Sequence, residues 1–250
     1  MKVRIILPFA MLVILACGLP GSATPDVQDT DEFIPAAETP APEQADQSQS
    51  GRPTDEAPFT RDDFEGSLLP GWTWQNENPD QWSLSAEAGW LEIMAAPGHI
   101  TGGSYANLLL RPAPAGDFQL ETALRFVPQA NFQFAGLIVY QSDADFVQAG
   151  RAYCLDSAVT CIGDGLYLDN YVNNTFQSPN FATPYDSGEL VHLRLQRTGA
   201  AYIFSASPDG INWSEIGQQE NGMDPLFIGL IATQNNSGLL PALFDYFEVK

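Results

Sequence analysis

The stretch LVHLRLQRTGAAYIFSASPDGINWSEIG, residues 190–217, decides the fold, because it contains three strand-like segments and the two turns between them. Apolar and polar residues alternate over 190–197, which is the period of a half-buried strand. Thr-Gly and Pro-Asp-Gly then interrupt the pattern, and Asp-Gly is a strong tight-turn signal. The stretch therefore predicts a β-meander in which Asp209 serves the second turn and Trp213 packs on the sheet or onto that turn.

The same alternation recurs through the rest of the chain, and no long stretch keeps a helical period. About a dozen short strands, punctuated by turn residues, indicate an antiparallel sandwich rather than a parallel α/β sheet. The sequence thus predicts an all-β fold of two antiparallel sheets. The expected strands are residues 82–84, 89–94, 107–110, 118–126, 135–141, 146–153, 165–171, 190–197, 200–208, 212–217, 227–233 and 242–249.

The first residues have the features of an export signal. Residues 1–16 combine a positively charged start with an apolar run that is short for a membrane span. The run leads directly to Cys17, an arrangement similar to the bacterial lipobox, which implies cleavage before Cys17 and its lipidation. An ordinary signal peptide, cut at the small residues 21–23, is the alternative.

Residues 17–58 have the composition of a tether. They are rich in Pro, Ala, Gln, Ser and acids, and such a segment buries too little apolar surface to fold. Proline and like charges keep it extended. We therefore expect one folded module, residues 59–250, displayed at the outer face of a bacterial membrane and attached to it only through the lipid.

The charge balance restricts the partners. The chain carries 10 Lys and Arg against 31 Asp and Glu, a formal net charge of −21. A surface this acidic repels phosphate backbones, and no cluster of basic residues offsets the repulsion locally. We therefore exclude nucleic acid as a partner.

Cys154 and Cys161 form an even pair in a chain with an export signal, which predicts a disulfide. A metal site built on the two cysteines is the alternative. Zinc sites normally use three or four Cys or His ligands, and neither of the two histidines, His99 and His192, lies nearby in the sequence.

Four segments occur in the order that a known family shows: Asp62–Ile93 (DDFEGSLLPGWTWQNENPDQWSLSAEAGWLEI), Phe134–Gly150 (FAGLIVYQSDADFVQAG), the meander above, and Ala242–Val249 (ALFDYFEV). Together they resemble the concanavalin A-like module at the C-terminus of family-43 β-xylosidases and its free-standing bacterial relatives. The resemblance covers nearly all of residues 61–250. It implies a two-sheet jelly roll, and a module that accompanies an enzyme or binds glycan without catalytic machinery of its own.

A catalytic role finds little support in the sequence. The Glu-x-Asp-x-x-Glu run of laminarinase-type sandwich enzymes and the Gly-x-Ser-x-Gly elbow do not occur, and neither histidine falls in a triad pattern. Two carboxylates brought together from distant strands would still make a glycoside hydrolase. That is the alternative to a non-catalytic module that binds carbohydrate or a surface protein.

The candidate ligand-binding residues lie on two neighbouring strands. Tyr167, Asp169 and Tyr171 share one strand face, and Arg151 and Tyr153 share a face one strand earlier. If these faces line the concave sheet, they form an aromatic and charged platform of the kind that holds sugar rings and hydroxyls. The alternative is that the tyrosines are half-buried strand formers.

The resemblance also implies a structural calcium where the first and last strands meet. Asp63 and Asp245 are the candidate ligands. Calcium takes at least six oxygen ligands, of which the sequence names two. Pairing of Asp245 with Arg61 or with a backbone group is the alternative.

Overall fold

The computed structural model describes residues 60–156, 160–234 and 238–250. Cys17 and the predicted signal and tether lie outside these residues. Within the described part, no helix has the length and apolar character needed to cross a membrane.

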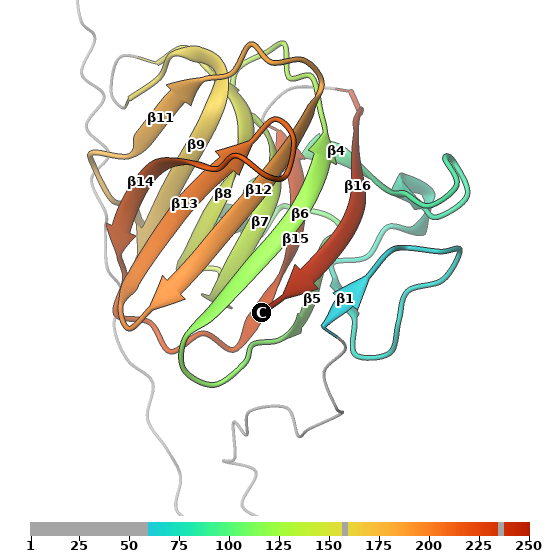
Figure 1. The fold of residues 1–250 in the computed structure, drawn as a ribbon, viewed down its shortest axis with the longest axis horizontal. Helices are drawn as coiled ribbons and strands as arrows, with labels where there is room; N and C mark the ends of the chain where they lie inside the picture. The colour runs from blue at the N-terminus through green and yellow to red at the C-terminus, as the bar shows by residue number, and fades with distance from the viewer. Residues whose placement is uncertain (1–59, 157–159, 235–237) are drawn as a thin grey trace, which may run out of the picture. The chain divides into compact units, whose positions relative to one another are not determined.

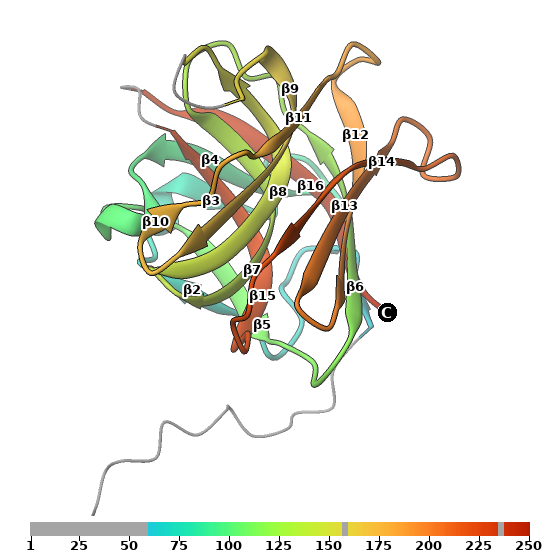
Figure 2. The same cartoon turned by 90° about the vertical axis from the view of Figure 1, so that its left-hand side faces the viewer.

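The described residues form an all-β sandwich of two layers, sheet A and sheet B (Figures 1 and 2). Sheet A has the spatial order β4 (Leu91–Pro97), β16 (Leu240–Val249), β6 (Phe118–Arg125), β12 (Leu190–Thr198), β13 (Ala201–Ser207) and β14 (Ser214–Glu220). Two short strands complete it, because β3 (Trp82–Ser83) pairs with β4 and β1 (Arg61–Asp62) pairs with β16.

Sheet B has the spatial order β9 (Gly163–Val172), β8 (Asp145–Cys154), β7 (Gln133–Ser142) and β15 (Phe227–Gln234). β5 (Leu108–Pro112) pairs with β15, and β2 (Thr73–Gln75) pairs with β5. At the other edge, β10 (Thr175–Phe176) and β11 (Phe181–Pro184) both pair with β9. Two short 3-10 segments, η1 (Pro79–Gln81) and η2 (Ile100–Gly102), lie between strands.

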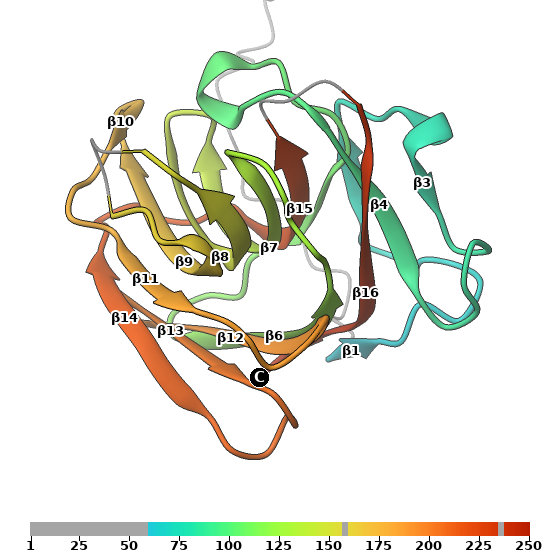
Figure 3. The same cartoon turned by 90° about the horizontal axis from the view of Figure 1, so that it is seen from above.

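The two sheets join along one side, where β4 and β15 run parallel (Figure 3). This link consists of two residue pairs, Thr233 with Ala96 and Gln234 with Pro97. All other strand pairs among the described residues are antiparallel, as the sequence predicts. The single parallel contact makes the sandwich one curled sheet at this side, a feature that the alternation of apolar residues does not indicate.

The main hydrophobic core fills the space between the sheets. In β12, the residues Val191, Leu193 and Leu195 are fully buried, and they alternate with partly exposed His192 and Arg194, as the strand period requires. A second buried cluster lies on the opposite, outer face of sheet B. Its members are Ile100, Tyr105, Leu108, Leu110, Phe134, Ile138, Tyr140, Phe146, Ala152, Cys154, Tyr167 and Ile231.

The meander of residues 190–217 is confirmed. β12 pairs with β13 and β13 with β14, all antiparallel. Oδ1 of Asp209 accepts the backbone N–H groups of Ile211 and Asn212 at 2.9 and 2.8 Å, so this carboxylate holds the turn. The ring of Trp213 lies under the guanidinium of Arg194, 3.7 Å from the ring centroid, and its Nε1 donates to the turn carbonyl of Gly210.

All twelve expected strands are present, with boundaries shifted by a few residues. β1, β2, β10 and β11 were not expected, because each is four residues or shorter and shows no alternation. The predicted disulfide is confirmed: Cys154 at the end of β8 is bonded to Cys161, just before β9, with their Cα atoms 4.9 Å apart.

Candidate functional site

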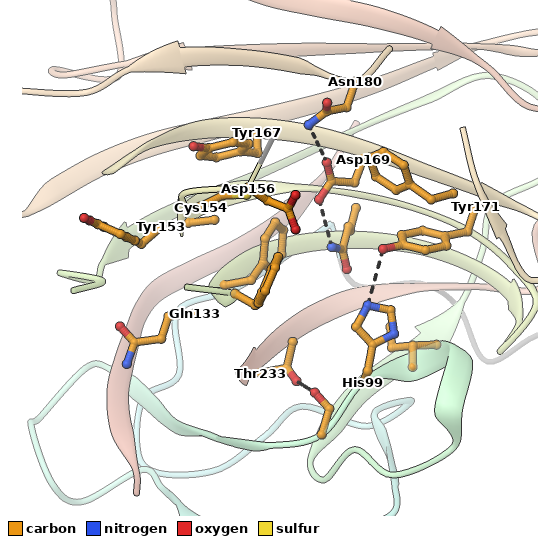
Figure 4. A pocket seen from close by; sticks show the side chains of 17 residues that line it. His99, Gln133, Tyr153, Cys154, Asp156, Tyr167, Asp169, Tyr171, Asn180 and Thr233 are labelled. Atoms are coloured by element: carbon orange, nitrogen blue, oxygen red, sulfur yellow. Dashed lines mark hydrogen bonds between the residues drawn. The ribbon is translucent and has the colours of Figure 1, made fainter. Parts of the chain in front are cut away.

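A cavity of about 270 Å³ opens on the outer face of sheet B, turned away from sheet A (Figure 4). β8 and β9 contribute its floor, and the segment that leads into η2 contributes one wall. The lining residues are Gly98, His99, Ile100, Phe132, Gln133, Phe134, Gln148, Ala152, Tyr153, Cys154, Asp156, Tyr167, Asp169, Tyr171, Phe176, Asn180 and Thr233. Aromatic and planar polar side chains therefore converge at one place.

Asp169 is the central polar group of the cavity. Its Oδ2 accepts Nε2 of Gln148 at 3.2 Å, and its Oδ1 accepts Nδ2 of Asn180 at 3.1 Å. Burial raises the pKa of Asp169 to about 6, although the hydrogen bonds from Gln148 and Asn180 act in the opposite direction. At pH 7 Asp169 is therefore an ionised acceptor, and each carboxylate oxygen keeps capacity for a further donor.

Tyr171 presents the main aromatic surface. Its ring stacks on Phe146 with the centroids 4.5 Å apart, and the ring of Phe176 meets it edge-on at 5.3 Å. The hydroxyl of Tyr171 lies 3.3 Å from Nε2 of His99. These contacts hold the tyrosine ring in one orientation.

His99 is neutral at pH 7, because burial lowers the pKa of its imidazole. Its Nδ1 accepts the backbone N–H of Thr101 at 3.3 Å and lies 2.7 Å from the Thr101 hydroxyl. Nδ1 is thus an acceptor, which puts the ring proton on Nε2 and makes this nitrogen the donor to Tyr171. The imidazole serves as a positioned donor rather than as a charged group.

Tyr167 reaches the cavity wall but not as the exposed platform that the sequence suggested. Its side chain is only 2% exposed. Its hydroxyl accepts the N–H of Ile162 at 3.0 Å and donates to the carbonyl of Gly163 at 2.7 Å. Tyr167 therefore fixes the connection between β8 and β9, which is the alternative that the sequence left open.

Arg151 does not share a face with Tyr167, which corrects the proposed grouping. In the β8–β9 register Arg151 lies opposite Leu166, a residue of the core between the sheets. Its Nε and Nη2 bind the carboxylate of Asp164 at 2.9 and 2.7 Å, and its Nη1 donates to the carbonyl of Gly188 at 2.8 Å. The guanidinium is thus committed to holding neighbouring segments together.

Tyr153 lies at the rim of the cavity. In the same register it faces Asp164, on the strand face that Arg151 occupies. Its ring points away from Asp169 and His99 in Figure 4. Of the five candidate residues, the structure therefore brings Tyr167, Asp169 and Tyr171 together at the cavity and leaves the other two at its edge or outside.

Several cavity residues were missed from the sequence. Gln148 lies directly opposite Asp169 in the strand pairing, so the register of β8 against β9 would have identified it. His99 comes from a loop between β4 and β5, and Asn180 from the segment between β10 and β11. No local sequence pattern places these two beside Asp169.

Two carboxylates, Asp156 and Asp169, are among the lining residues. A glycosidase mechanism needs one to act as acid and the other as base or nucleophile on either side of a sugar. Both oxygens of Asp169 already accept hydrogen bonds, which favours the role of a fixed acceptor for a ligand hydroxyl. The arrangement suits recognition better than proton donation.

The structural calcium stays a prediction. Oδ1 of Asp63 accepts Nε of Arg61 at 2.6 Å, and burial raises the pKa of Asp245. Among the described residues, no three or more Asp, Glu, His or Cys side chains converge in a way that would hold a metal. Because Ca²⁺ needs several oxygen ligands, these side chains do not fit such a site on their own.

This architecture is similar to that of known proteins. Residues 61–250 match the family model described as the Beta xylosidase C-terminal Concanavalin A-like domain. A xylan 1,3-beta-xylosidase from Vibrio sp is 26% identical over 242 residues, which cover 88% of this chain and 43% of that protein.

Solved structures agree on the fold. The GH43 protein BlXynB from Bacillus licheniformis has a TM-score of 0.67 at 17% identity, over 78% of this chain and 39% of that one. A xylan beta-1,4-xylosidase from Bacillus halodurans C-125 has a TM-score of 0.65 at 18% identity, over 81% of this chain and 41% of that one. The chain thus spans less than half the length of the proteins that it matches.

Proposed function

Because this chain belongs to the family of β-xylosidase C-terminal concanavalin A-like domains, we propose that it binds carbohydrate without catalysing a reaction on it. The observation that carries the proposal is the cavity of sheet B, where the ring of Tyr171 lies beside the planar polar groups of Asp169, Gln148 and Asn180. Sugar rings stack on aromatic faces, and their hydroxyls bind to carboxylates and amides.

The names of its relatives suggest the class of sugar. The two enzymes above are called xylan xylosidases, of the 1,3- and the 1,4-type. We therefore expect xylose-containing oligosaccharides among the ligands. A surface protein as partner is the alternative outcome of the tests below.

The test is calorimetric titration with β-1,3- and β-1,4-xylo-oligosaccharides, preceded by a glycan array. Tyr171→Ala should weaken binding about fivefold, since an aromatic contact of this kind contributes on the order of 1 kcal/mol. Tyr185→Ala is the matched control, because Tyr185 contacts Leu190 and Arg151 outside the cavity. Equal affinity of Tyr171→Ala and the native protein would show that the cavity is not the binding site.

Glycoside hydrolysis is the second candidate. Its support is that Asp156 and Asp169 line the same cavity and that the pKa of Asp169 is raised to about 6, as suits an acid catalyst. A hydrolase would release reducing sugar from xylo-oligosaccharides and lose that activity in Asp169→Asn. Binding without release of sugar supports the first proposal.

We also propose that the module is held at the cell surface by a lipid on Cys17, on the strength of the signal-like residues 1–16. Expressed in a bacterium that modifies lipoproteins, the native protein should partition into a detergent phase. Cys17→Ala should shift it to the aqueous phase. Equal partitioning of both proteins argues for an ordinary signal peptide.

A further inference from the structure

Beside the cavity, the loop that contains η2 covers the outer face of sheet B. The loop that contains η2 places Ile100 and Tyr105 on this face, where they are 2% and 5% exposed. They belong to one buried cluster with Ile138 and Phe146, which are fully buried. A sheet face that could otherwise hold an extended polymer is therefore occupied by the protein's own side chains.

This cover is anchored at several points. The N–H of Gly98 donates to the carbonyl of Gln234 at 2.8 Å, and the carbonyl of Gly98 accepts the hydroxyl of Thr233 at 2.6 Å. Further along, the hydroxyl of Tyr105 donates to Oδ1 of Asp143 at 2.8 Å. The loop is thus a built wall of the cavity.

At another side, Cys154 and Asp156 at the end of β8 line the cavity, and Asn180 contacts Thr160 at the start of the chain that leads to β9. Oδ1 of Asn180 accepts the N–H of Thr160 at 3.0 Å, and its Nδ2 lies 3.3 Å from the Thr160 carbonyl. Thr160 precedes Cys161, whose disulfide to Cys154 ties this connection to β8. Asn180 therefore links Thr160, in the connection between β8 and β9, to Asp169 on the floor of the cavity.

From this enclosure we infer that the cavity receives the terminal sugar of a chain and does not accept the interior of a polysaccharide. The inference rests on the proposed carbohydrate binding. At about 270 Å³ the cavity is at the small end for ligand sites, so it suits about one sugar unit. An interior unit needs two exits for the chain, and the covered face of sheet B closes the direction across the sheet.

The chemistry of Asp169 favours the same end group. A terminal sugar carries a free hydroxyl at the position where an interior unit carries its next glycosidic bond. That hydroxyl can donate to the ionised carboxylate of Asp169 in addition to the amides of Gln148 and Asn180. An interior unit lacks this hydroxyl. The additional charge-assisted hydrogen bond favours the terminal unit.

The experiment measures molar affinity for xylo-oligosaccharides of one to six units by calorimetry. For end recognition, affinity should level off at two units and stay within about twofold up to six. A steady rise with length would overturn the inference, because it requires contacts along the chain. Absence of binding at every length would instead contradict the proposed function itself.

A ligand whose terminal hydroxyl is methylated provides a second test. Xylobiose should bind at least tenfold more tightly than xylobiose methylated at the terminal hydroxyl of one end, and Asp169→Asn should reduce this difference. Blocking the hydroxyl at either end without effect on affinity would overturn the inference. Asp117→Asn is the control, since Asp117 binds Gly199 outside the cavity.

Discussion

Asn180 donates a hydrogen bond to Asp169, with 3.1 Å between Nδ2 and Oδ1, and the same amide group pairs with the backbone of Thr160. One side chain thus connects the carboxylate of the cavity floor with the connection that the disulfide closes.

We expect Asp169 to titrate near pH 6 in the folded protein, against 3.8 for an ordinary aspartate, because burial penalises its charged form. The folded state then binds this proton more tightly than the unfolded state. The protonated carboxyl stabilises the fold at about pH 4, and this contribution is lost as the pH rises through 6.

Carbon-13 NMR of the carboxyl group measures the midpoint directly. Asp169→Asn does not titrate, so its free energy of unfolding should fall less between pH 4 and 7 than that of the native protein, by on the order of 2 kcal/mol. Sugar binding to the native protein should weaken below pH 6, as the acceptor is protonated. A midpoint near 4 contradicts this prediction.

Removal of the disulfide in the variant Cys154→Ser with Cys161→Ser should lower the free energy of unfolding by about 2–3 kcal/mol, from loop-closure entropy. Urea unfolding measures the change. Reduction of the native protein should produce a similar loss, whereas the double variant should not respond to the reductant. We also expect weaker sugar binding, because Thr160 helps to place Asn180.

Gly150 on β8 should not tolerate a side chain. A Cβ at this position would lie 2.1 Å from the carbonyl oxygen of Ala135 on β7. Gly150→Ala should therefore destabilise the fold by about 2 kcal/mol or more, because the two backbones must separate. Gly222→Ala is the control: nothing lies within 4 Å of its added Cβ, so its free energy of unfolding should change little. Thermal unfolding compares the two.

Asp209 should support the turn through its charge. Asp209 accepts hydrogen bonds from the backbone N–H and the side-chain amide of Asn212, from the N–H of Ile211 and from the hydroxyl of Ser207. These donors hold the pKa of Asp209 well below its usual range. The resulting stabilisation is present above the pKa of an ordinary aspartate and is lost as the pH falls.

Asp209→Ala should consequently lower the midpoint of urea unfolding at pH 7 and have less effect at pH 3. Asp209→Asn keeps one acceptor oxygen and should have a smaller effect at pH 7. An equal loss at both pH values would show that the carboxylate charge does not contribute.

The strand pattern was accessible from the sequence because alternation is a local property. It identified β12 and β13 with their turn, and it placed Tyr167, Asp169 and Tyr171 on one face of β9. β1, β2, β10 and β11 escaped because each has only two to four residues and too short a stretch to show alternation.

The grouping of Arg151 with Tyr167 was wrong for a related reason. Alternation within a strand assigns its own two faces, but the register between β8 and β9 decides which faces coincide. A register offset by one residue exchanges the two faces of a strand. The actual pairing puts Gln148 beside Asp169 and turns Arg151 toward the core between the sheets.

The sequence alone therefore determined the all-β class, most strands, the disulfide and one aromatic and acidic strand face, since each depends on residues close in the chain. Only the tertiary structure decided that His99, Gln148 and Asn180 meet Asp169 and Tyr171, and that the rest of this sheet face is covered. These residues come from separate strands and loops, and their meeting depends on strand register and loop packing between distant segments, which no local pattern encodes.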